Sequence, residues 1–134
     1  MKTLTIEAIR SQKYSAILDF CVSGRSLLKE IERRKGCDFV SRLGSELEPT
    51  DVRTRDALLL EKTDDLSSGR VVLYTCPCGD FGCGVISAKI IREGKHIIWS
   101  DFGYENEFDD ELILLERLGP FRFEEEQYRQ AIMG

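Results

Sequence analysis

The fold of this chain is decided by residues 70–100, which read RVVLYTCPCGDFGCGVISAKIIREGKHIIWS. Two apolar runs in it, Arg70–Thr75 and Gly84–Arg92, are short and bounded by turn residues, which is typical of strands. A Glu-Gly pair then suits a tight hairpin, after which residues 96–100 return as the next strand. The stretch therefore predicts an antiparallel β-meander around residues 70–101.

The sequence before this stretch predicts a hairpin and a helix. Residues 4–9 have period-two character, and apolar side chains alternate over residues 14–22, so that Asp19 is expected on the exposed face of a strand. Ser26 is expected to cap a helix over residues 26–35 that carries one apolar stripe. The following segment, residues 37–69, has no decisive pattern.

The sequence after it closes with a helix. Residues 112–118 fit either a helical turn or an extended edge strand, and a Gly-Pro pair ends them. Residues 124–132 predict a helix, because three leading glutamates suit the positive end of its dipole. The whole is expected to be one α+β domain, residues 1–134, with a mainly antiparallel sheet and helices packed on it.

Length and composition bound the class of protein. The chain has 134 residues, of which 42% are hydrophobic, enough for a core without disulfide support. No apolar run approaches the ~18 residues of a membrane span, and charges interrupt the N-terminal segment where a signal peptide is apolar. We therefore expect a cytoplasmic protein whose five cysteines are thiols or metal ligands rather than disulfides.

Charge is unevenly distributed along the chain. Residues 101–134 contain ten acidic and three basic residues, a net charge of −7, whereas residues 1–100 have fourteen acidic and sixteen basic residues. A surface of this sign disfavours nucleic acid, because phosphates require positive charge. It favours a basic protein partner.

The acidic segment also contains aromatic side chains. Aromatic anchors ringed by charge suit a protein interface. The predicted partner-binding residues are Asp101, Tyr104, Glu105, Glu107, Phe108, Asp109, Asp110 and Glu111. No P-loop, G-x-S-x-G or H-E-x-x-H motif is present, so the sequence predicts no catalytic residues.

Three cysteines, Cys76, Cys78 and Cys83, are spaced C-x-C-x4-C in the loop between two predicted strands. Such thiolates suit zinc, although structural sites more often begin with C-x2-C. The candidate fourth ligands are Asp80 in the loop, His96 in the next strand, and Cys21 or Cys37, which the fold could bring close. A thiol pair could instead exchange disulfides, or one thiol could pair with His96. The third interpretation treats these cysteines as small apolar residues around a glycine turn. The residues alone leave these alternatives open.

Residues 73–84, LYTCPCGDFGCG, resemble the Cys-Pro-x-x-Cys-Gly-Asp-x-Gly-Cys-Gly loop of a group of small, poorly characterised bacterial proteins. The similarity continues through residues 99–104, WSDFGY, and residues 119–123, GPFRF, to Tyr128-Arg129. This chain departs from the group in the closer spacing of its first two cysteines. The resemblance implies kinship and bacterial origin and carries no activity.

In its size, acidity and lack of catalytic motifs, the chain is also similar to immunity proteins of bacterial toxin–immunity pairs. That resemblance implies a non-catalytic protein that neutralises a cognate toxin, often a basic nuclease, through an acidic surface. The alternative hypothesis is a zinc-binding or thiol-redox protein that uses the cysteine loop. The resemblance specifies neither the partner nor the oligomeric state.

Overall fold

The computed structural model describes residues 2–9, 17–35, 40–43, 52–62, 69–75, 84–105 and 112–133. Within these ranges the chain is α+β and mainly antiparallel sheet. The strands are β1 (Leu4–Ile9), β2 (Ile17–Val22), β3 (Arg25–Ser26), β4 (Val40–Ser41), β5 (Val71–Thr75), β6 (Val85–Glu93), β7 (His96–Glu105), β8 (Ile113–Leu114) and β9 (Phe121–Glu124). The helices are α1 (Leu27–Lys35), α2 (Val52–Leu58) and α3 (Glu125–Met133).

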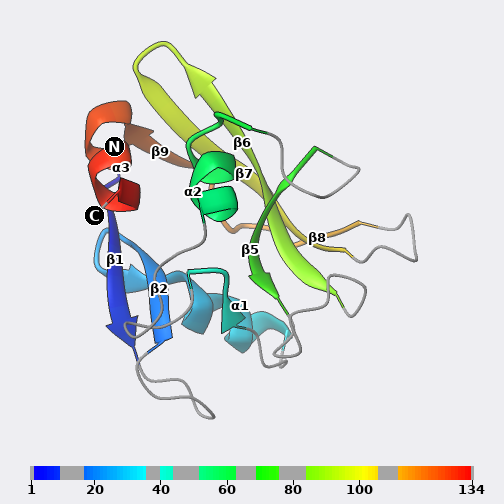
Figure 1. The fold of residues 1–134 in the computed structure, drawn as a ribbon. Coiled ribbons are helices and arrows are strands. Elements are labelled where there is room, and N and C mark those ends of the chain that lie inside the picture. The colour runs from blue at the N-terminus through cyan, green and yellow to red at the C-terminus, as the bar shows by residue number, and fades with distance from the viewer. Residues whose placement is uncertain are drawn as a thin grey trace.

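The described strands form two sheets. The smaller has the order β1-β2-β3, and the larger has the order β4-β5-β6-β7-β8 with β9 also paired to β7. All of these pairings are antiparallel, and the long β6–β7 hairpin stands at the top of Figure 1. A parallel bridge between Lys2 and Phe123 joins the start of the chain to β9, so the two sheets meet at this point.

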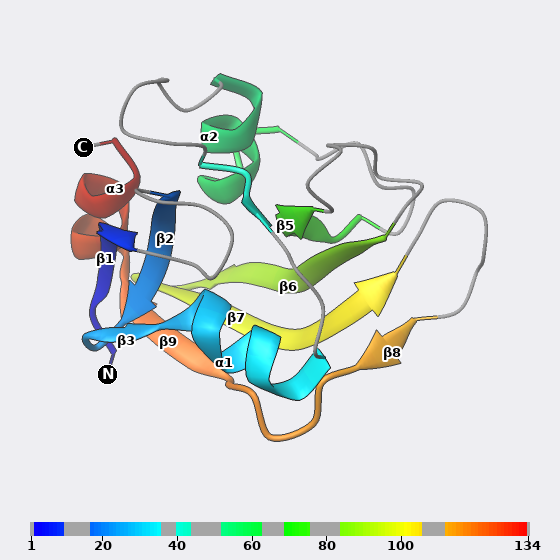
Figure 2. The ribbon, with the colours of Figure 1, turned by 90° about the horizontal axis from the view of Figure 1, so that it is seen from below.

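The helices cover the core where the two sheets meet. α1 packs against β2, and α3 packs against β1, β9 and α2. Figure 2 shows α3 beside β1 at one end of the molecule and β8 at the opposite end. As predicted, the hydroxyl of Ser26 caps α1, accepting a hydrogen bond of 3.1 Å from the amide of Lys29. Tyr128 and Ile132 of α3 are buried, as its predicted apolar stripe requires.

Two β-bulges change which side chains face the core. In β7, Asp101 and Phe102 lie opposite the single residue Ala88 of β6, and Asp101 adopts the left-handed conformation at φ 51°. Because the extra residue shifts the alternation by one, Trp99 and Phe102 both point into the core. A second bulge lies in β5, around Leu73.

Trp99 is the centre of an aromatic cluster. Four rings surround its indole at centroid distances of 5.3 to 6.4 Å, and they belong to Phe20, Phe102, Phe123 and Tyr128. The indole N–H donates to the Tyr128 hydroxyl at 3.2 Å, and that hydroxyl donates to the carbonyl of Leu58 at 2.6 Å. Leu58 ends α2, so this carbonyl has no donor within its own helix. The cluster thereby joins β2, β7, β9, α2 and α3.

One sequence prediction about β2 is wrong. Asp19 is expected on an exposed face, but its side chain is completely buried, and the neighbouring Phe20, Cys21 and Val22 are buried as well. β2 is covered on both faces, because α1 packs against the strand and core residues of the larger sheet also pack against it. In the described ranges, no helix is both long enough and apolar enough to cross a lipid bilayer.

We predict that Tyr128→Phe lowers the free energy of unfolding by about 2 kcal/mol, because two buried groups, the Trp99 N–H and the Leu58 carbonyl, lose their shared partner. Urea unfolding followed by tryptophan fluorescence measures the change. Gln130→Ala, an exposed position on the same helix, serves as the control and is expected to change stability by less than about 0.5 kcal/mol. Equal effects of the two substitutions would contradict the role given to this hydroxyl.

Candidate functional site

The predicted partner-binding residues divide into two groups. Asp101, Tyr104 and Glu105 lie on β7, near the end of the larger sheet that carries β8. The other five, Glu107, Phe108, Asp109, Asp110 and Glu111, lie outside the described residues, in the connection from β7 to β8. The structure therefore bears directly on the first group only.

Glu105 is engaged inside the chain. Its carboxylate lies 3.2 Å from Nε of Arg70, and both side chains are almost buried, at 12% and 11% exposure. The buried hydroxyl of Ser87 donates to the same carboxylate at 2.6 Å. Burial lowers the pKa of Arg70, while the charges of Glu105 and Asp101 act in the opposite direction. Glu105 thus neutralises an internal cation, a role that sequence reasoning missed because Arg70 lies 35 positions earlier.

Asp101 has an exposed side chain and a backbone carbonyl that forms a hydrogen bond inside the chain. Its side chain is exposed, and its carbonyl oxygen accepts a hydrogen bond from the Arg70 guanidinium. It occupies the left-handed position of the β7 bulge, a conformation that Asp tolerates better than most residues. Its carboxylate therefore stands on a backbone fixed by a bulge and by Arg70.

The strand after the acidic segment exposes apolar side chains. Leu112, Ile113 and Leu114 are 38%, 45% and 50% exposed, and we call these three residues the β8 edge. Successive side chains of a strand point to opposite faces, so β8 is exposed on both. It is also the last strand on its side of the sheet in the ranges that the structure describes. An unpaired, apolar strand edge is a surface that favours association.

Two glycines hold this end of the sheet tightly. A Cβ on Gly103 would lie 2.7 Å from Cδ1 of Leu112, so the absence of a side chain lets the β8 edge approach β7. A Cβ on Gly84 would lie 2.2 Å from the Tyr104 hydroxyl, and Gly84 has φ +116°. The half-buried Tyr104 ring consequently packs across the start of β6. The β8 edge and Tyr104 form one surface on a backbone that other residues would distort.

The cysteine loop itself, with Cys76, Cys78 and Cys83, lies outside the described residues. Its two ends are adjacent, because Thr75 pairs with Val85. His96, in contrast, pairs with Glu93 at the far end of β6. Val85 and Glu93 are eight residues apart along β6, which corresponds to roughly 26 Å. Since Cys78 is only three residues from Thr75, a reach of about 11 Å, His96 lies too far away to be a shared ligand or a base for these thiols.

Cys21, a fourth cysteine, is a free thiol in the buried strand β2. It is buried in β2 without a disulfide, and burial, with a hydrogen bond to Glu7 and the charge of Asp19, raises the pKa of its thiol to about 12. The thiol is therefore protonated at neutral pH and is a poor nucleophile. Within the part of the chain that the structure describes, no three His, Cys, Asp or Glu side chains are placed to hold a metal ion.

Asp19 is the most enclosed carboxyl group of the described residues. Its oxygens accept hydrogen bonds of 2.5 Å from the Tyr74 hydroxyl, 2.5 Å from the Ser26 hydroxyl and 3.3 Å from the amide of Leu28. Burial raises its pKa, and these hydrogen bonds oppose the rise. Because its donors fill both oxygens and its side chain has no exposure, Asp19 fixes β2, α1 and β5 together rather than serving as a catalytic acid.

Comparison with known proteins finds no relative: no protein-family model, curated protein or solved structure matches this chain.

We predict that the stability which Asp19 contributes declines as pH rises above about 4. The pKa of Asp19 in the folded chain is raised above its ordinary value of 3.8. The stability that Asp19 contributes is therefore complete below pH 3.8, and it is lost as the pH rises from there through the pKa of the folded chain. The difference in unfolding free energy between the wild type and Asp19→Asn should therefore shrink with pH, by at most about 1.4 kcal/mol per pH unit. Urea titrations from pH 4 to pH 8 measure this difference.

Tyr74→Phe provides the complementary variant. It removes a hydrogen bond that lowers the pKa of Asp19, so the decline should extend to higher pH than in the wild type. A difference between wild type and Asp19→Asn that is constant or grows with pH would show that burial does not control this carboxyl group.

Proposed function

We propose that this chain is a non-catalytic protein-binding domain, an immunity protein that neutralises a cognate bacterial toxin in the cytoplasm. The observation that carries the proposal is the exposure of Leu112, Ile113 and Leu114 on both faces of an edge strand. An apolar centre surrounded by charge is the usual anatomy of a specific protein interface. The proposed docking surface consists of the β8 edge, Tyr104, Asp101 and the acidic residues of segment 106–111.

Charge complementarity indicates a basic partner. Residues 101–116 contain seven acidic residues and no basic residue. Of these seven, Glu105 is neutralised by Arg70. In the rest of the acidic segment 101–134, Glu125 pairs with Arg92. Arg122 and Arg129 pair with Glu93 and Glu61, which lie earlier in the chain. Along the sequence, the excess of acidic residues therefore lies in residues 101–116, which include the β8 edge.

The two components of the surface have different tasks. Apolar side chains at an interface centre supply most of the affinity, because their burial removes them from water. Charges at the rim mainly accelerate and select the encounter, and salt screens them. A basic toxin domain that covers β8 would use both components. Such a domain could also continue the sheet by pairing a strand with β8.

The gene neighbourhood and co-expression test the function. We expect a gene for a large secreted toxin directly beside the gene for this chain. Co-expression of that toxin's C-terminal domain with this chain should restore the growth of bacterial cells. Toxicity that persists in the presence of the wild-type chain would contradict the proposal.

The docking surface predicts a specific pattern of variants. Ile113→Ser/Leu114→Ser should weaken binding to the toxin domain by roughly tenfold or more, since both side chains belong to the proposed apolar centre. Because both side chains are already about half exposed, stability should change by less than about 1 kcal/mol. Calorimetry or surface plasmon resonance measures affinity, and urea unfolding measures stability.

The matched control is Val52→Ser/Met133→Ser, which removes two exposed apolar side chains from other elements and should leave affinity unchanged. Asp109→Lys/Asp110→Lys/Glu111→Lys should slow association and reduce its dependence on salt. Unchanged affinity and unchanged salt dependence in this charge-reversal variant would remove the acidic segment from the interface.

A second candidate function is a zinc- or thiol-dependent protein built on Cys76, Cys78 and Cys83. The observation that favours it is the pairing of Thr75, at the end of β5, with Val85, at the start of β6. The cysteine loop therefore leaves and re-enters the sheet at adjacent positions. Thiolates in such a loop could converge on one ion. Because His96 pairs with Glu93 at the far end of β6, we build this candidate on ligands other than His96.

The zinc candidate predicts about one zinc ion per chain in protein purified without a histidine tag. Cys76→Ser/Cys78→Ser/Cys83→Ser should lose both the metal and stability, as measured by elemental analysis and urea unfolding. Cys21→Ser is the control, because this buried thiol lies outside the loop: it should lose stability and retain the zinc. Metal-free wild-type protein, or zinc that survives the triple substitution, argues against a zinc site in this loop.

A further inference from the structure

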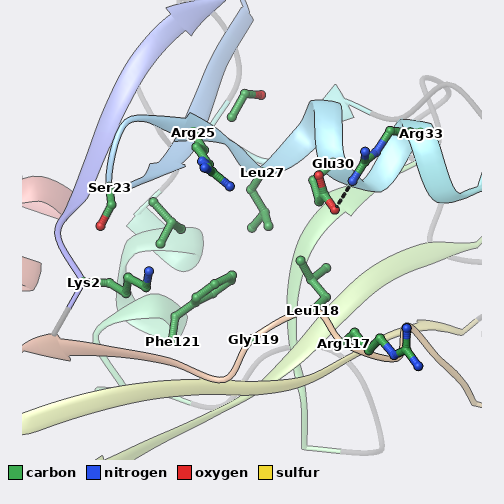
Figure 3. A pocket seen from close by; sticks show the side chains of 12 residues that line it. Lys2, Ser23, Arg25, Leu27, Glu30, Arg33, Arg117, Leu118, Gly119 and Phe121 are labelled. Atoms are coloured by element: carbon green, nitrogen blue, oxygen red, sulfur yellow. Dashed lines mark hydrogen bonds and ion pairs between the residues drawn. The ribbon is translucent and has the colours of Figure 1, made fainter.

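A pocket of about 510 Å³ lies between the start of α1 and the segment 117–121. Its volume falls within the range of small-molecule sites, about 300–1,000 Å³. Figure 3 shows the two walls: Ser23, Arg25 and Leu27 on one side, and Leu118 and Phe121 on the other. The pocket shares no residue with the proposed docking surface.

The lining of this pocket is basic although the whole chain has a net charge of −5. Four cationic side chains contribute to it, Lys2, Arg25, Arg33 and Arg117, against the single carboxylate of Glu30. Glu30 already pairs with Arg33 at 2.6 Å. In the described part of the chain, no carboxylate forms an ion pair with the side chain of Lys2, Arg25 or Arg117. The pocket therefore has an excess of uncompensated positive charge.

The positive charge adjoins an apolar surface. In Figure 3, Lys2 and Arg25 extend toward the space beside the Phe121 ring, and Arg117 lies at the opposite end, beyond Leu118. Leu27 and Leu118 are buried, and Phe121 is half-buried. An anionic group between Lys2 and Arg25 would place its apolar body against Phe121.

Both walls are fixed by contacts behind them. The Phe121 ring packs edge-on against Phe102 at a centroid distance of 5.5 Å. A Cβ on Gly119 would lie 2.9 Å from the Phe102 ring, so glycine lets this wall approach the core. On the other side, the Ser26 hydroxyl donates to the buried Asp19 carboxylate. A site whose walls are already ordered loses little entropy when a ligand binds.

Two amides at the start of α1 already have acceptors and are not available to an anion. The amide of Leu28 donates to Asp19, and that of Lys29 donates to the Ser26 hydroxyl. The recognition of a negative group consequently depends on the side chains of Lys2 and Arg25. Arg117, which also lines the pocket, has the unusual φ of 65° for a non-glycine residue.

We propose that this pocket binds a small organic anion, a carboxylate or phosphate ester joined to an aromatic or other apolar body. Lys2 and Arg25 bind the anionic group, and Phe121, Leu27 and Leu118 contact the apolar body. The site is independent of the proposed toxin-binding surface, so either assignment can fail without the other.

Titration of the full chain with phenyl phosphate, phenylacetate, inorganic phosphate and phenol, followed by heteronuclear NMR, tests the proposal. At least one aromatic anion should shift the amides of Ser23, Leu27 and Leu118 saturably, and the tighter of the two identifies the preferred anionic group. Inorganic phosphate lacks the apolar body and phenol lacks the charge, so each should bind at least roughly tenfold more weakly.

Lys2→Gln/Arg25→Gln should weaken binding of the aromatic anion by roughly tenfold or more, and each single substitution should give part of that loss. Lys29→Gln/Lys89→Gln removes the same charge from exposed positions outside the pocket and should bind as the wild type does. Urea unfolding confirms that both double variants are folded.

Three outcomes overturn the proposal. The first is the absence of saturable shifts at the pocket with either aromatic anion. The second is unchanged binding by Lys2→Gln/Arg25→Gln. The third is equal affinity for inorganic phosphate and phenyl phosphate, which would indicate adventitious attraction of an anion to surface charge.

Discussion

The packing around the Trp99 indole is the constraint on which the rest of the structure depends. Its ring contacts side chains from β2, β9 and α3, and its N–H shares the Tyr128 hydroxyl with the end of α2. These elements come from both ends of the sequence and from both sheets. A single side chain thus sets how the smaller sheet and the helices lie on the larger sheet. Aromatic pairs in edge-on contact contribute about 0.5–1.5 kcal/mol each beyond the burial of their area.

The two bulges explain why so many large side chains reach this core. Strict alternation would direct Trp99 and Phe102 to opposite faces of β7, but the extra residue at Asp101 brings both inside. The bulge in β5 likewise lets Leu73 and Tyr74 join the same core. Tyr74 then reaches Asp19 across the interface between the sheets. A change of alternation therefore creates the polar contact that locks β2 against β5.

Local patterns in the sequence were sufficient for several elements, but not for β4, α2 and β8, and they did not predict the contacts between elements. The strand at residues 4–9, the cap at Ser26 and the apolar stripe of α3 follow from periodicity and capping, which are properties of short segments. The bulges carry no such signal, because Asp101 in a strand reads as a polar, outward residue. The burial of Asp19 was missed because its partner Tyr74 lies 55 positions away. The ion pair of Glu105 was missed because Arg70 is also distant in the sequence. The basic pocket joins the first residues of the chain to residues 117–121, so no window of sequence contains it.

The distribution of ion pairs explains how an acidic protein can present surfaces of both signs. Arg70 pairs with Glu105, and Arg92 pairs with Glu125, so two basic residues from the first hundred positions neutralise acidic residues of segment 101–134. The charges are also distributed unevenly: residues 101–116 contain seven acidic residues and no basic residue, whereas Lys2, Arg25 and Arg117 line the pocket. Salt screens exposed charges beyond about 8–10 Å, so the local composition of each surface, more than the net charge, governs what binds there. A positive ligand at the β8 edge and an anion at the pocket are consequently compatible on one chain, and neither follows from a net charge of −5.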